Sequence, residues 1–158
     1  MSKVKLTRKP DKEEVDELKR LELECVEILE DNNLLRDTHT PKEVVNSLRN
    51  FIDLYKVGNI TKKTQNYDMI NLAYGMGELY ASTIIDIYSW NYEFVEKEDG
   101  FSSFAVVSPN KKWCIFIHNY FYTLLYEKSK SNNLLLTFNM IDAKGLQKYE
   151  KDEYTPLS

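Results

Sequence analysis

The 158-residue sequence has few of the residues that break or cross-link a chain: five glycines, four prolines and two cysteines. So few glycines and prolines argue against a loop-rich or low-complexity architecture. Cys25 falls in a predicted helix and Cys114 in a predicted strand, and we interpret both as separate buried thiols. No run approaches the roughly 18 apolar residues that span a bilayer, and residues 1–10 lack the apolar core of a secretory signal. We therefore expect a cytoplasmic protein with no membrane contact.

Histidine and arginine are also scarce. His39 and His118 are the only histidines, too few for a metal site without carboxylates from elsewhere, and we expect His118 to end a strand and help cap the next helix. The net charge of −4, with four arginines in the chain, disfavours nucleic acid as a partner. Nucleophile-elbow, phosphate-loop and His-Glu-x-x-His patterns are absent from the sequence. We therefore predict no enzyme, and no catalytic, cofactor-binding or metal-binding residues.

The composition is that of a folded domain. Apolar residues make up 42% of the chain and aromatic residues 13%, and this length is sufficient to bury one core. We expect residues 1–158 to form a single domain, with residues 1–10 and about 148–158 as loose tails.

Two helices are predicted in the N-terminal part. The first, over Asp11–Asp31, begins with Asp11 as N-cap and Glu14 three residues later. The second begins at Thr40-Pro41-Lys42-Glu43, which combines an N-cap, a proline at the first helical position and an acidic capping residue, and it ends at Gly58.

A third helix is predicted over Thr64–Ser89, and we expect it to be the buried central helix because most of its sides are apolar. Its polar residues fall in one narrow stripe, which we interpret as solvated: Asp68, Asn71, Glu78, Ser82 and Asp86. Gly77 lies in the apolar arc, where it allows another backbone to come close. Gly75 lies in the polar stripe, where a kink, a close approach and chance all remain open.

The sequence after this helix predicts three antiparallel strands. They are Tyr92–Glu98, Phe101–Val107 and Trp113–His118. Asp99-Gly100 is typical of a two-residue hairpin turn, and Ser108-Pro109-Asn110-Lys111 of a type I turn. Strands two and three have apolar residues on both faces. We expect one face to cover the helices, and the other either to be covered by another element or to form an exposed apolar patch.

Helical periodicity returns at Asn119. Leu134–Ile141 is ambiguous between a helix and an added strand, and we favour the helix. The predicted fold is therefore α+β: two N-terminal helices, a buried central helix, a three-stranded antiparallel meander and C-terminal helices.

Two features point to the surface. The first helix has ten acidic and three basic residues, a charge of −7, whereas the rest of the chain has 18 basic and 15 acidic residues. Such a helix can attract a basic partner, although a solvated face is the simpler interpretation. Twelve of the twenty aromatic residues lie between Tyr88 and Tyr126, and Tyr and Trp favour interfaces. The candidate interface residues are Glu13, Glu17, Glu24, Glu27, Trp90, Tyr92, Trp113 and Tyr120.

One segment resembles a known group. Leu72-Ala73-Tyr74-Gly75-Met76-Gly77-Glu78, then Trp90, then Ala105-Val106-Val107-Ser108-Pro109 resemble small bacterial proteins of unknown function, some of which look like immunity proteins of toxin systems. The resemblance covers about Met69 to Tyr122 and brings no catalytic residues with it.

The sequence therefore predicts a non-enzymatic protein that binds another protein, as an immunity-type inhibitor of a toxin or other partner protein. A basic surface on the partner would suit the acidic helix. The alternative is a small-ligand-binding or enzymatic domain with a pocket near Glu78, Ser82 and Trp90. The partner's identity and the oligomeric state cannot be derived from the sequence.

Overall fold

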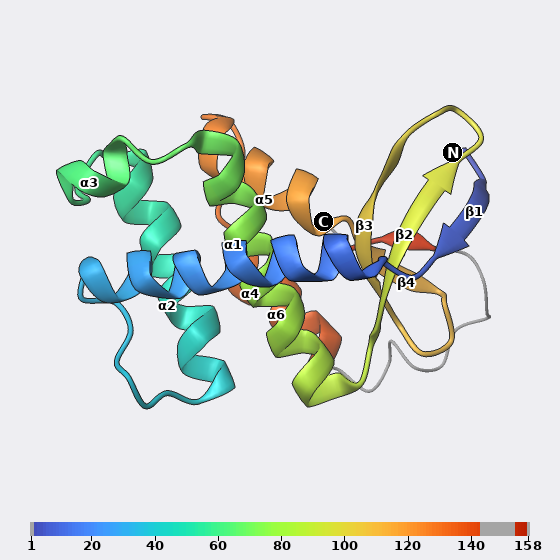
Figure 1. The fold of residues 1–158 in the computed structure, drawn as a ribbon, viewed down its shortest axis with the longest axis horizontal. Coiled ribbons are helices and arrows are strands. Elements are labelled where there is room, and N and C mark those ends of the chain that lie inside the picture. The colour runs from blue at the N-terminus through green and yellow to red at the C-terminus, as the bar shows by residue number, and fades with distance from the viewer. Residues whose placement is uncertain (1, 143–153, 158) are drawn as a thin grey trace.

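The computed structural model describes residues 2–142 and 154–157, and over these residues the fold is α+β, as predicted. Figure 1 shows the helices gathered on one side of the molecule and the sheet on the other, with α1 lying across α4. The elements in chain order are β1 (Val4–Arg8), α1 (Lys12–Asp31), α2 (Pro41–Lys56), α3 (Lys62–Gln65), α4 (Met69–Tyr88), β2 (Asn91–Lys97), β3 (Ser102–Val107), β4 (Trp113–Ile115), α5 (Ile117–Tyr126), α6 (Leu134–Asp142) and β5 (Thr155–Pro156).

The first two helices begin as the sequence predicts. The Asp11 carboxylate accepts a hydrogen bond from the backbone N–H of Glu14 at 2.8 Å, and the Glu14 carboxylate accepts from the N–H of Asp11 at 2.9 Å. This reciprocal pair is a capping box. Thr40 caps α2 by accepting from the N–H of Glu43, and Gly58 follows the helix with a positive φ of 75°.

The predicted third helix is divided, so the prediction of one continuous helix from Thr64 is wrong at its start. Thr61 caps the short α3, and Asp68 caps α4 by accepting from the N–H of Asn71 at 2.9 Å. An Asp side chain that bonds a backbone N–H three residues later favours a new helix start over continuation. The C-terminal end was placed well, because Ser89 stops α4 in the left-handed conformation.

α4 is the central helix, as predicted, and both of its glycines are sites of close backbone approach. A Cβ atom on Gly75 would lie 2.6 Å from the carbonyl oxygen of Leu21 in α1. A Cβ atom on Gly77 would lie 3.0 Å from the carbonyl oxygen of Ile117 in α5. Gly75 therefore lets α4 pack closely against α1, and Gly77 lets α4 pack closely against α5. Of the three explanations left open for Gly75, close approach of another backbone is the correct one.

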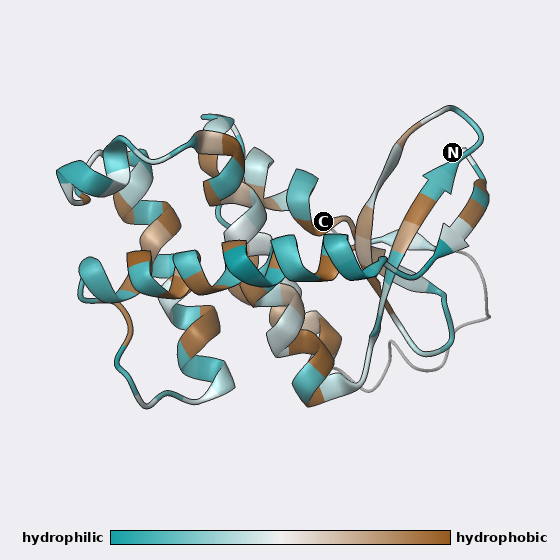
Figure 2. Ribbon diagram, in the orientation of Figure 1, coloured by the Kyte–Doolittle hydropathy of each residue, from teal (hydrophilic) through white to brown (hydrophobic). Residues whose placement is uncertain are grey.

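The polar stripe of α4 was interpreted as solvated, and this is wrong for the middle of the stripe. Glu78 is 6% exposed, and the Ser82 hydroxyl donates a hydrogen bond to Glu22 of α1. Only the ends of the stripe, at Asp68 and Asp86, are exposed. α1 covers the middle of the stripe, and apart from Glu22 most of its hydrophilic residues face outward. Figure 2 shows that helix as mostly teal.

The β2-β3-β4 meander is confirmed, but the sheet has five strands in the described part of the chain, in the order β1-β2-β3-β4-β5. β1 pairs antiparallel with β2, from Val4 opposite Lys97 to Arg8 opposite Phe94. β5 pairs parallel with β4. The prediction of loose tails is therefore wrong for residues 4–8 and 155–156, whereas residues 148–153 lie outside the described residues. A terminal strand leaves little signal of its own because its partner lies far away in sequence.

Two details of the meander differ from expectation. The first hairpin turns through three residues, 98–100, because the N–H of Gly100 donates to the Lys97 carbonyl and the N–H of Lys97 donates to the Phe101 carbonyl. Gly100 takes the left-handed conformation, as in a type I turn followed by a bulge. The predicted third strand is too long, because β4 ends at Ile115 and α5 begins at Ile117, two residues before the point where helical periodicity was expected to return. His118 therefore lies in the first turn of a helix.

Both faces of the sheet are buried, which decides between the two alternatives left open for the second face. One face packs on the helices, and the other forms a second small core with Val95, Ala105, Val107 and Cys114 at its centre. The two cysteines are buried and unpaired, as predicted, and burial raises the pKa of the Cys114 thiol to about 12. Across residues 2–142 and 154–157, no helix is long and apolar enough to cross a membrane.

The ambiguous Leu134–Ile141 segment is helical, as favoured, and belongs to α6. It packs on Tyr120, whose hydroxyl donates to Asn133 Oδ1 at 2.7 Å and lies within hydrogen-bond distance of the Thr137 hydroxyl, at 3.1 Å. The neighbouring Tyr80 is fully buried, and its hydroxyl has no hydrogen-bond partner within the described structure.

These two tyrosines give a paired prediction. Tyr80→Phe should raise the free energy of unfolding by about 1 kcal/mol, because it removes a buried hydroxyl that makes no hydrogen bond. Tyr120→Phe should lower it by about 1 kcal/mol, because it leaves the polar groups of Asn133 and Thr137 without that partner. Urea unfolding of both variants and the wild type measures the two changes, and a destabilised Tyr80→Phe protein would mean that its hydroxyl has a partner after all.

Candidate functional site

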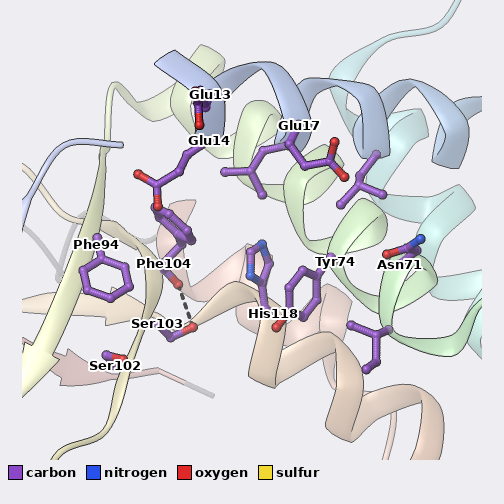
Figure 3. Close-up of a pocket in the computed structure, with 13 residues that line it drawn as sticks. Glu13, Glu14, Glu17, Asn71, Tyr74, Phe94, Ser102, Ser103, Phe104 and His118 are labelled. Atoms are coloured by element: carbon purple, nitrogen blue, oxygen red, sulfur yellow. Dashed lines mark hydrogen bonds between the residues drawn. The ribbon is translucent and has the colours of Figure 1, made fainter. Parts of the chain in front are cut away.

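A groove of about 610 Å³ lies between the N-terminal half of α1, the start of α4, the sheet and the first turn of α5. Figure 3 shows its lining, with the acidic side chains of α1 on one side and aromatic rings from α4, the sheet and α5 on the other. We call it the acidic groove. Its acidic residues are Glu13, Glu14 and Glu17, and its rings are those of Tyr74, Phe94, Phe104 and His118.

The three carboxylates line the groove because the first turns of α1 lie beside it. Glu13 is exposed and has no ion-pair partner among the described residues. Glu14 accepts two hydrogen bonds from the Arg8 guanidinium, at 2.7 and 3.1 Å, and these bonds lower the pKa of Glu14 to about 2. Glu17 accepts from Arg20 Nε at 3.0 Å, which lowers its pKa also. Glu14 and Glu17 thus remain negatively charged at neutral pH.

His118 and three rings form the aromatic side of the groove. The imidazole stacks on Tyr74 with ring centroids 3.9 Å apart and planes 13° from parallel. Phe104 meets the same imidazole edge-on at 5.9 Å and contacts Phe94 at 5.2 Å. The rings are therefore held in fixed positions by one another, so the wall is largely preformed.

The buried Glu78 carboxylate fixes the orientation of the His118 imidazole. Its Oε2 atom lies 2.7 Å from His118 Nε2 and accepts a hydrogen bond from the Tyr92 hydroxyl at 2.7 Å. A carboxylate only accepts hydrogen bonds, so this arrangement places a hydrogen on Nε2. Burial, and after it the nearby Glu78, raises the pKa of Tyr92. Three polar groups from α4, β2 and α5 are thus joined inside the core, and His118 is the one that also reaches the groove.

The acidic groove continues into a smaller hollow of about 330 Å³, which shares Tyr74, His118 and Ser103 with it. This second part adds Phe101, Asn119 and Tyr122 to the lining, none of which carries a charge, and its two rings give it a largely apolar surface. Ile70 lines both parts with 54% of its surface exposed, and Tyr122 is 43% exposed. The complete groove is therefore acidic at one end, aromatic in the middle and apolar at the other.

The predicted acidic interface residues divide into two groups. Glu13 and Glu17 line the groove. Glu24 is half-buried and accepts hydrogen bonds from Arg20 and from the Tyr67 hydroxyl. Glu27 is exposed but lies outside the groove. Only the first turns of α1 thus contribute to a concave surface.

The predicted aromatic interface residues are mostly not on the surface. Trp90 is 6% exposed and Tyr120 is 3% exposed, because both pack in the core. The Tyr92 hydroxyl is bonded to Glu78, and Trp113 is half-buried in β4. The aromatic cluster therefore mainly builds the core, and the rings that face the groove are others.

The predicted alternative pocket is not formed as described. Within residues 2–142 and 154–157, Glu78, Ser82 and Trp90 do not line one hollow together: Ser82 bonds Glu22, Glu78 lies under His118, and Trp90 lines a separate hollow. Tyr74, Phe94, Phe104 and His118 line the groove but were not predicted to do so. Tyr74 lies inside α4, Phe94 and Phe104 lie inside β2 and β3, and His118 lies in the first turn of α5, so these residues share no local pattern that singles them out.

The described residues hold no cluster of three or more His, Cys, Asp or Glu side chains that could bind a metal ion. Chemically, the groove offers carboxylates and π faces to a ligand, which together suit a positively charged group. Comparison with protein-family models, with curated proteins and with solved structures finds no match to this chain.

Proposed function

We propose that this protein works by binding another protein, and that the acidic groove receives a segment of that partner. The segment carries a Lys or Arg side chain for the acidic end and an apolar side chain for the opposite end. The observation that carries the proposal is the juxtaposition in one groove of three carboxylates, four packed rings and an exposed apolar end.

The acidic end suits an extended cationic side chain. A Lys or Arg head group near Glu13 and Glu17 gains charge-assisted hydrogen bonds, and its aliphatic stem can lie on Tyr74 and Phe104. A cation over an aromatic face contributes a further 0.5–1 kcal/mol or so at an exposed site. Because the rings are already packed, little side-chain order has to be created on binding.

The apolar end supplies the part of the affinity that salt does not weaken. Ile70, Phe101 and Tyr122 each leave more than a third of their surface exposed. Burying exposed apolar area is worth about 25 cal/mol per Å² before the costs of association. The charge of −7 on the predicted first helix adds long-range attraction for a basic partner and should raise the association rate.

Inhibition of a toxin is the biological role we infer for such a binder, following the resemblance of residues 69–122 to immunity proteins. A basic partner surface would be typical of a toxin that acts on nucleic acid, since phosphate binding requires Lys and Arg. Covering that surface with the acidic groove would block it.

A second candidate is an enzyme or small-ligand protein, favoured by the His118–Glu78 pair alone. A buried carboxylate that orients an imidazole at the edge of a groove is the arrangement of a general base. The experiment below separates the two candidates, because a binder returns its peptide unchanged whereas a catalyst alters it, and mass spectrometry of the recovered peptide shows which.

The test is fluorescence anisotropy with short labelled peptides that have a Lys/Arg-rich half and an apolar half, compared with peptides in which Glu replaces each basic residue. We expect the basic peptides alone to bind. The Glu13→Gln/Glu17→Gln variant should weaken binding about tenfold, or about 1.4 kcal/mol. The matched control, Asp16→Asn/Glu27→Gln, removes the same charge from exposed positions of α1 outside the groove and should change the affinity by less than about threefold.

Two results would reject this use of the groove. One is equal weakening by both double variants, which would show attraction to net charge and no specific site. The other is equal binding of the acidic and the basic peptides.

A further inference from the structure

His118 brings to the acidic groove a hydrogen-bonding atom that the protein itself does not use. The residue is 5% exposed, and it lines both parts of the groove. Its Nε2 atom bonds Glu78, whereas its Nδ1 atom makes no hydrogen bond or ion pair within the described residues. Nδ1 is also not sealed in the core, because the fully buried side-chain atoms without a partner in the described part of the chain belong to Tyr80 and Glu93.

The packing of the imidazole fixes the direction in which Nδ1 points. Nε2 bonds Glu78, and Cδ2 lies 3.4 Å from the place that a Cβ atom on Gly77 would take, so this edge of the ring faces α4. Nδ1 and Cδ2 are attached to opposite sides of Cγ, so Nδ1 points away from Gly77. Tyr74 stacks on one face of the ring and Phe104 contacts it edge-on. Figure 3 shows the imidazole between α5 and the acidic side chains of α1, so Nδ1 lies on the side of the ring that is open to the groove.

In the neutral ring this arrangement makes Nδ1 an acceptor. Glu78 fixes a hydrogen on Nε2, and a neutral imidazole carries only one. A largely buried acceptor without a donor is unfavourable, and a donor from a ligand removes that cost. His118 is shared by the acidic part of the groove, with Glu13 and Glu17, and by the part that ends at Tyr122. The donor therefore belongs between the basic and the apolar group of the ligand.

We propose that the partner's segment binds in an extended conformation, and that a backbone N–H between its basic and its apolar side chain donates to His118 Nδ1. The N–H groups of an extended segment are free to bond, whereas those inside a helix are used by the helix. A bond to the main chain fixes the position of the segment along the groove, and its side chains then reach the two ends. The inference rests on the proposed function and adds to it the conformation of the partner and the residue that sets its register.

The labelled basic peptides, each N-methylated at a single backbone nitrogen, test this bond at about pH 8, where an ordinary imidazole is neutral. At one position, between the basic and the apolar half, N-methylation should weaken binding to the wild type about tenfold, because it removes the donor. The same N-methylation should weaken binding to His118→Gln by less than about twofold, since Gln keeps an amide donor for Glu78 but lacks Nδ1. Glu13→Gln/Glu17→Gln is the matched control: it should bind all the peptides more weakly and keep the tenfold penalty.

The imidazole nitrogens report the same bond in the wild-type protein. In a long-range nitrogen–proton spectrum of the free protein, the Nδ1 resonance of His118 should be that of an unprotonated nitrogen. Saturating basic peptide should move it toward the protonated value, because Nδ1 then accepts a hydrogen bond. The other histidine of the chain, His39, is exposed and lies outside the groove, so its resonances should stay in place.

Three results overturn the inference while leaving the proposed function intact, provided that basic peptides bind. They are a protonated Nδ1 in the free protein, an Nδ1 resonance that peptide does not move, and N-methylation penalties that are the same in the wild type and in His118→Gln. If His118→Gln does not fold, the Nδ1 resonance of the wild type decides alone. If no basic peptide binds, the proposed function fails, and this inference fails with it.

Discussion

The Gly75→Ala variant is expected to lose about 3 kcal/mol of unfolding free energy, at the upper end for overpacked core positions. A Cβ atom at this position would lie 2.6 Å from the Leu21 carbonyl oxygen and 3.2 Å from the Cys25 Cβ atom. The nearer of these two atoms, the Leu21 carbonyl oxygen, belongs to the backbone and cannot rotate away as a side chain can. α1 therefore has to move away from α4 to make room for the added methyl group. In an exposed helix the same change would stabilise by up to about 1 kcal/mol, so packing reverses the sign given by helix propensity.

Two further variants make this prediction specific. Gly77→Ala meets the Ile117 carbonyl oxygen at 3.0 Å, a milder contact, and should cost about 1 kcal/mol. Asp86→Ala, at an exposed position of the same helix, should change stability by less than about 0.5 kcal/mol. Chemical unfolding of the Gly75→Ala, Gly77→Ala and Asp86→Ala proteins measures the order of their stabilities directly. A Gly75→Ala protein as stable as the wild type would show that α1 and α4 are not in close contact.

Replacing Glu78 with alanine is expected to cost about 3–5 kcal/mol, the sum of about 1–3 kcal/mol for each of two buried groups left unsatisfied and a cavity. Its carboxylate is the acceptor for both the Tyr92 hydroxyl and His118 Nε2. Without it, two buried polar groups lose their common partner, and the methyl group leaves a cavity beside them. The imidazole also loses what fixes its orientation against Tyr74, so the groove should bind peptide less well in whatever fraction remains folded.

A double-mutant cycle shows whether the loss comes from the interaction itself. We compare Glu78→Leu, His118→Leu and the combined variant by urea unfolding. If the two side chains depend on each other, the combined variant should be about 1–3 kcal/mol more stable than the sum of the single changes indicates. Strict additivity would contradict the coupling inferred from their 2.7 Å separation.

The sequence predicted well those features that neighbouring residues decide. The capping box of Asp11 and Glu14 and the start of α2 at Thr40 and Pro41 depend on contacts within one helical turn. The order of helices and strands from α4 to β4 also followed from local periodicity and turn residues. Errors of this kind were small, such as the break at Asp68 and the two-residue shift in the start of α5.

The sequence could not predict the groove, because its parts come from segments far apart in the chain. Glu17, Tyr74, Phe104 and His118 meet only when α1, α4, the sheet and α5 pack together. Placing His118 at a strand end instead of in a helix also hid its contact with Glu78, forty residues away. Trp90 and Tyr120 were predicted at an interface because Trp and Tyr are common there, but both lie in the core.

By itself the sequence determined most of the secondary structure between α1 and α6, the α+β class and the concentration of negative charge in one helix, because these follow from residue type and spacing. Only the tertiary structure decided where that charge acts. Close packing at Gly75 and Gly77 brings α1 and α5 against α4, so the polar stripe of α4 is covered and the acids of α1 lie beside the aromatic side of the groove. The physical reason is that burial and proximity depend on contacts between distant segments, which no local pattern records.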